Sequence, residues 1–152
     1  MPPSTSTQPD KVMRECHCGH HMTVACWNAG KDRNKKKPYN KATVVGATMF
    51  WLLCPNIARY ISLLESQGLV REWSDKMEAS PDLQRLYTAT HTEYEKWVEA
   101  TLPAESWEQF KKFHIDHKAR KYGNGGVNVP TAVKCLHAQS AMYLAGLPNP
   151  VG

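Results

Sequence analysis

The sequence has no apolar run near the roughly 20 residues that a membrane-spanning helix needs. Its longest apolar stretch is only residues 49–54. The first ten residues are rich in Pro, Ser and Thr and contain no apolar core, so they do not read as a secretory signal. We therefore expect a non-secreted protein with a cytoplasmic or cytoskeletal location.

The common catalytic signatures are also missing. The chain has no Gly-x-Ser-x-Gly, no Gly-Lys-Ser phosphate loop and no Gly-x-Gly-x-x-Gly. Acidic pairs such as Glu93 and Glu95 have the spacing of a solvated helix face. No set of acids and bases stands out, which favours a non-catalytic protein.

What the sequence does contain is enough for a folded core. The 152 residues include five Trp, six Tyr and three Phe, too many aromatic side chains for a disordered chain. The length suits one domain. We predict a flexible tail at residues 1–11 and a single globular domain at 12–152.

Periodicity predicts an α+β fold: a small antiparallel sheet near the N-terminus packed on four or five α-helices. Short, partly β-branched segments at 22–27 and 42–53 are typical of strands. Helical spacing follows Pro55, and Ser80-Pro81 is typical of a helix N-cap. Gly68 and Gly146 are expected to end helices. The expected helices cover about 57–68, 70–79, 81–100, 103–122 and 131–145.

Five cysteines, an odd and uneven set, make metal or thiol chemistry more plausible than a disulfide framework in a reducing compartment. Residues 16–21, Cys-His-Cys-Gly-His-His, hold five possible metal ligands. Cys26 lies on a predicted strand and is best explained as a small core residue. Cys54 precedes a helix, where the N-terminal positive charge lowers a thiol pKa. Plain core packing is an equal alternative for Cys54 and Cys135.

Two sequence blocks resemble an uncharacterised family, domain of unknown function 501. The first block is Phe-Trp-Leu-Leu-Cys-Pro at 50–55 with Ser-Leu-Leu-Glu-Ser-Gln-Gly at 62–68. The second is Lys-Cys-Leu-His-Ala at 134–138 with Asn-Pro-Val-Gly at 149–152. The family's Cys-x-x-Gly-x-Pro pattern is matched in part at 16–21, where His21 stands in place of Pro. The family carries no activity to transfer, but the resemblance implies that Cys16, Cys54, Cys135 and His137 stand on motif positions. Three thiols and one imidazole match the ligand count of a Cys₃His zinc site, and an iron–sulfur site is an alternative.

The charge is concentrated in one segment. Residues 1–60 hold nine Lys and Arg against three Asp and Glu, whereas residues 61–152 hold ten against eleven. Most of the surplus lies in the predicted basic loop at 28–41, in Lys31, Arg33, Lys35, Lys36, Lys37 and Lys41. Such a loop attracts polyanions, and a merely solvated loop is an equal alternative.

From these observations we expect a non-catalytic binding or structural module. It would be a component of a larger assembly that docks on an anionic partner, either an acidic protein surface such as the tubulin lattice or nucleic acid. A Cys/His metal site, with zinc as the cofactor, would stabilise it. The alternative is a thiol- or metal-dependent enzyme that uses Cys54 or Cys135 with His137.

Overall fold

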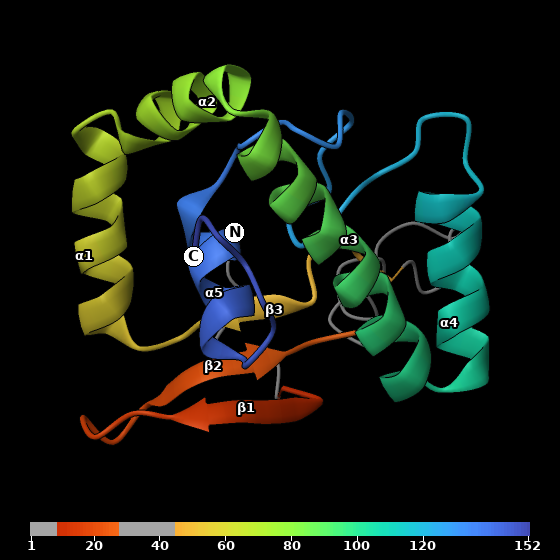
Figure 1. Ribbon diagram of the computed structural model, residues 1–152. Coiled ribbons are helices and arrows are strands. Elements are labelled where there is room, and N and C mark those ends of the chain that lie inside the picture. Colours follow the sequence, from red (N-terminus) through yellow and green to blue (C-terminus); the bar gives the residue numbers. More distant parts are fainter. Residues whose placement is uncertain (1–8, 28–44) are drawn as a thin grey trace, which may run out of the picture.

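The N-terminal part of the chain forms a three-stranded antiparallel sheet in the order β1-β2-β3 (Figure 1). The computed structural model describes residues 9–27 and 45–152. The strands are β1 (Lys11–Glu15), β2 (His21–Ala25) and β3 (Phe50–Leu52). β2 pairs with β3 through Thr23 and Leu52 and through Ala25 and Phe50. The predicted antiparallel pairing of these two segments is therefore confirmed.

In the described residues, five α-helices and one π-helical turn accompany the sheet, so the predicted α+β class is confirmed. They are α1 (Pro55–Ser66), α2 (Leu69–Ala79), α3 (Pro81–Thr101), α4 (Ala104–Phe110), the π-helix η1 (Lys111–Ile115) and α5 (Leu136–Leu144). α5 packs on β3 and β2, and α1 packs against α5 on one side (Figure 1). No helix in the described parts of the chain has the length and apolar character that crossing a bilayer requires.

Several helix ends follow the expected local chemistry. The Ser80 hydroxyl accepts a hydrogen bond from the Leu83 backbone N–H at 3.2 Å, as a helix N-cap does. Gly68 separates α1 from α2 in the left-handed conformation, with φ of 87°. This conformation is strained for other residues, which explains why the chain turns there.

The strands differ from expectation at their ends. β1 was not predicted, because Lys-Val-Met-Arg-Glu is polar and mostly exposed at the edge of the sheet. It forms by hairpin pairing with β2. Within the described part of the predicted strand 42–53, only Phe50–Leu52 is extended in the sheet.

Two predicted helices are shorter than their sequence patterns suggest. The helix expected at 103–122 ends as α4 at Phe110 and continues only through the π-helical turn to Ile115. That turn allows His114 Nε2 to donate to the Val45 carbonyl at 2.7 Å. The helix expected at 131–145 begins only at Leu136, because the preceding residues are held by tertiary contacts. Tyr87 donates its hydroxyl to the Ala132 carbonyl at 3.0 Å.

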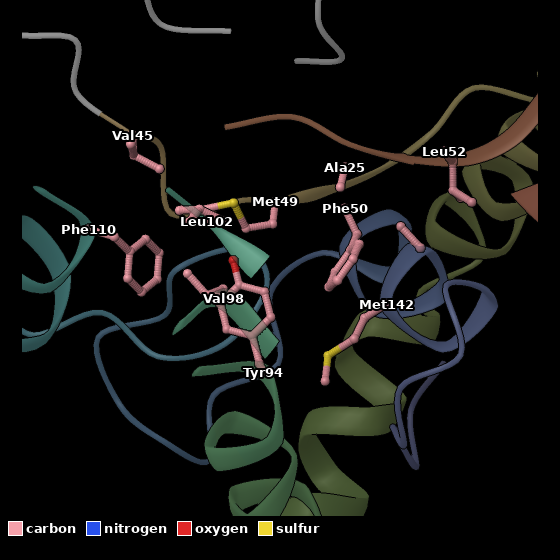
Figure 2. Packing of buried hydrophobic residues seen from close by; sticks show 11 residues of the cluster. Ala25, Val45, Met49, Phe50, Leu52, Tyr94, Val98, Leu102, Phe110 and Met142 are labelled. Atoms are coloured by element: carbon pink, nitrogen blue, oxygen red, sulfur yellow. The ribbon is translucent and has the colours of Figure 1, made fainter. Parts of the chain in front are cut away.

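The main core lies between the sheet, α3 and α5 (Figure 2). Phe50 of β3 is fully buried, and its ring lies 4.6 Å from that of Trp97 and 6.0 Å from that of Tyr94, both on α3. Met142 of α5 joins the same cluster. This packing fixes the positions of β3 and α5, the elements that adjoin the two groups of metal-ligating side chains described below.

The last residues of the chain dock back onto α5. Asn149 donates to Gln139 Oε1 at 2.7 Å and accepts from the backbone N–H groups of Val151 and Gly152. Val151 is buried. The Asn-Pro-Val-Gly block therefore closes a second apolar cluster formed by α2, α3 and α5.

Candidate metal centres

The structure gathers metal-ligating side chains into two groups among the residues that it describes. The first group is Cys16, Cys18 and Cys54, and the second is Glu65, Cys135 and His137. Within each group the ligand atoms all lie within 4.8 Å of one another. The four ligands suggested by the sequence are therefore divided, with two in each group.

The hairpin between β1 and β2 supplies two thiols of the first group. The backbone N–H of Cys16 donates to the His20 carbonyl at 3.0 Å, and that of Gly19 donates to the Cys16 carbonyl at 3.2 Å. Gly19 has φ of 87°, a conformation that glycine adopts at little cost. This tight turn places Cys16 and Cys18 together at the tip of the hairpin.

The third thiol comes from the start of α1. Cys54 is the N-cap of this helix and its side chain is fully buried. The pKa of the Cys54 thiol is lowered from its ordinary value of 9.0, chiefly because the backbone N–H of Ile57 stabilises the thiolate. The neighbouring thiols act in the same direction, and burial opposes them. Because metals bind the thiolate, this environment favours metal coordination.

The sulfur separations agree with tetrahedral zinc geometry. Cys54 Sγ lies 3.5 Å from Cys16 Sγ and 3.5 Å from Cys18 Sγ. Zinc–sulfur bonds of about 2.3 Å at tetrahedral angles put sulfur atoms about 3.8 Å apart. Small side-chain rotations therefore suffice to close the three sulfurs on one ion. All five cysteines are free.

His20 lies next to the group but is not part of it, and it becomes a fourth ligand when its side chain turns toward the other two sulfurs. His20 Nδ1 lies 3.6 Å from Cys18 Sγ, and a zinc-bound sulfur and nitrogen are about 3.6 Å apart. The side chain of the adjacent His21 instead contacts Glu15, with Nδ1 2.9 Å from Oε1.

The second group joins the C-terminal half of α1 to the start of α5. His137 Nδ1 lies 3.1 Å from Glu65 Oε1, and the same oxygen accepts the Leu136 backbone N–H at 2.8 Å. Cys135 is the N-cap of α5 and is partly buried. Glu65 is therefore anchored at the helix N-terminus, where an anion is favoured.

The family model described as protein of unknown function (DUF501) matches residues 12–152. The chain belongs to this family. Neither the curated proteins nor the solved structures gave a match. The resemblance seen in the sequence blocks is thus confirmed over nearly the whole chain, and it leaves the activity to be argued from the two side-chain groups.

Two of these ligands were not selected by sequence reasoning. Cys18 is one of the five possible ligands at 16–21, but only Cys16 of this pair stands on a motif position of the family. Glu65 lies within the Ser-Leu-Leu-Glu block of the DUF501 resemblance, yet a lone glutamate on an amphipathic helix carries no signal of its own. Only the packing of α5 against α1 shows that Glu65 faces His137.

Cys26 and His91 have structural roles. Cys26 is buried, and burial raises the pKa of its thiol to about 11, as suits the core residue that we predicted. His91 is buried in contact with Gly123 and donates from Nε2 to the Pro130 carbonyl at 2.7 Å. Burial lowers the pKa of His91, so it is neutral at pH 7.

The proposed partner-binding residues lie outside the described residues. They are Lys31, Arg33, Lys35, Lys36, Lys37 and Lys41. Their contribution stays a prediction from charge alone.

Proposed function

We propose that the chain is a zinc-binding module in which one ion, held by Cys16, Cys18, Cys54 and His20, stabilises the fold. The observation that carries the proposal is the convergence of three thiols from two distant segments, with Cys54 Sγ 3.5 Å from each of the other two sulfurs. A divalent cation bound by all three sulfurs would explain why these thiols converge, because it stabilises each of them as the thiolate.

A structural role follows from the position of the ion. Cys54 is fully buried, so a substrate has no access to its sulfur even though its thiol pKa is lowered. Cys16 and Cys18 lie at the tip of the hairpin, whereas Cys54 is the N-cap of α1. Zinc would therefore tie the edge of the sheet to α1, and its binding energy would add to the stability of the fold.

Metal analysis of protein purified under reducing conditions tests the proposal. We expect Cys18→Ser to lose one equivalent of zinc relative to the parent chain. We also expect a fall in Tm of about 10 °C, or ~3 kcal/mol, because a structural ion is removed. Cobalt substitution of the parent should give the thiolate charge-transfer bands of a sulfur-rich site, reduced in the variant.

Matched controls separate coordination from packing. Cys26→Ala removes a thiol outside the group and should keep the full zinc content. His20→Ala should weaken zinc binding, while His21→Ala should leave it unchanged, since His21 faces Glu15. An unaltered zinc content in Cys18→Ser, with no loss of stability in chelator, would refute the proposal.

We also propose, from charge alone, that the module is non-catalytic and docks on an anionic partner through the basic segment at 28–41. The surplus of Lys and Arg in this segment supports the idea. Its test is charge reversal at Lys35, Lys36 and Lys37.

A further inference from the structure

The Nε2 side of the His137 ring faces two oxygen atoms on α1. Nε2 lies 3.2 Å from the carbonyl oxygen of Ala58, which can only accept, so Nε2 is the donor. The hydroxyl of Ser62 donates to the same carbonyl at 2.9 Å and its oxygen lies 3.1 Å from Nε2. Nε2–H is therefore shared between two acceptors on α1.

The other ring nitrogen then faces a carboxylate. His137 Nδ1 points at Glu65 Oε1, 3.1 Å away. This separation is close to that of a nitrogen and an oxygen bound to one tetrahedral zinc ion, so a metal ion can be bound by both atoms.

Cys135 adds a third ligand atom to this pair. Its Sγ lies within 4.8 Å of both ligand atoms, so a third donor of the type that zinc prefers completes the group. A hydrogen bond between His137 and Glu65 needs no thiol. In addition, the Nε2–H bond to a backbone carbonyl is the usual outer support of a metal-bound histidine.

A tetrahedral ion on these three ligands would keep one position for a further ligand, and a cavity adjoins two of the three. The cavity has a volume of about 380 Å³ and is bordered by Cys135 and His137. Its walls are mainly apolar, with Phe50, Trp51 and Leu52 of β3 on one side. Lys134 lies on its lining and is exposed. A volume of this order suits a small molecule.

We propose that Glu65, Cys135 and His137 form a second metal site, with an open position that takes a small carboxylate whose apolar body occupies the cavity. Three protein ligands and one exchangeable position are the arrangement of reactive or ligand-binding zinc, in contrast to the closed structural site at the hairpin. The ligand carboxylate binds the metal and its charge is complemented by Lys134. This site is independent of the proposed structural ion.

The stoichiometry of zinc tests the site itself. Glu65→Gln retains an oxygen that can accept the Leu136 N–H but removes the anionic ligand. We expect it to reduce the zinc content by one equivalent, from two to one, with the circular dichroism spectrum unchanged. Glu72→Gln is the matched control, because Glu72 is an exposed glutamate paired with Lys76 on α2.

The open position is tested with cobalt in place of zinc. We expect phenylacetate to change the visible d–d bands at concentrations at least tenfold below those needed for acetate, which lacks the apolar body. Glu65→Gln should abolish the change. Equal effects of the two probes would overturn the assignment of the cavity.

The two metal proposals can fail separately. If Glu65→Gln lost one zinc and Cys18→Ser lost none, only the proposal of a structural ion at Cys18 would be refuted. A zinc content that Glu65→Gln leaves unaltered would overturn the second site. The same conclusion would follow if nitrogen NMR of the zinc-saturated protein showed both ring nitrogens of His137 protonated at pH 7.5.

Discussion

A single buried amide, Asn124, joins the sheet to the last helix. Its Oδ1 accepts from the backbone N–H groups of Met49 and Phe50 at 2.9 and 3.0 Å. Its Nδ2 donates to the carbonyls of Phe50 and Ala138 at 3.1 and 2.8 Å. The Gly/Asn-rich loop, which reads as a flexible connection in the sequence, thus satisfies backbone groups that would otherwise be buried without partners.

We predict that Asn124→Ala lowers the free energy of unfolding by about 3 kcal/mol, because four hydrogen-bonding groups lose their partner in the core. The measurement is urea unfolding at constant zinc. Asn128→Ala is the control, since Asn128 is exposed and contacts Lys121. A change below about 0.5 kcal/mol in Asn124→Ala would show that water replaces the amide.

At the scale of elements, the ends of helices and strands are set by two kinds of cause. Local chemistry sets the cap at Ser80 and the left-handed stop at Gly68, and both were predictable. Tertiary contacts set the late start of α5 and the early end of α4. Gly123 is another position that is determined by a tertiary contact. Its φ is 66°, and a Cβ there would clash with the ring of His91.

We predict that Gly123→Ala destabilises the protein by about 3 kcal/mol, through backbone strain and the clash with His91. Gly46→Ala is the matched control, because a Cβ at Gly46 meets nothing within 4 Å and φ there is not positive. Thermal unfolding of the two variants, compared with the parent, measures the difference. Equal stability of the two variants would mean that the loop moves away from His91.

At the scale of the whole molecule, the charge is divided between the N-terminal segment and the rest. The segment at 28–41 holds the positive surplus, whereas most described charges outside it are mixed in sign or paired, as in Arg120 with Glu95 at 2.6 Å. A long-range field from this segment would speed and strengthen association with a polyanion at low salt.

We predict that Lys35→Glu, Lys36→Glu and Lys37→Glu together weaken binding to a labelled single-stranded RNA and to polyglutamate at least tenfold at low salt. The control combines Lys96→Glu, Lys112→Glu and Lys118→Glu, three exposed cations elsewhere, so the change in net charge is the same. Fluorescence anisotropy at several salt concentrations gives the affinities. Equal weakening by both triple variants would show that net charge acts without a docking segment.

The sequence by itself determined the fold class, the pairing of β2 with β3, several helix ends and membership of the DUF501 family. These depend on local periodicity, capping residues and motif blocks, all of which are written along the chain. Only the tertiary structure decided which ligands share a centre. The hairpin brings Cys18 to Cys54, and the packing of α5 on α1 brings Glu65 to His137. These contacts depend on how elements that are far apart in the sequence pack together. The spacing of residues along the chain does not determine the distance between such side chains in the fold.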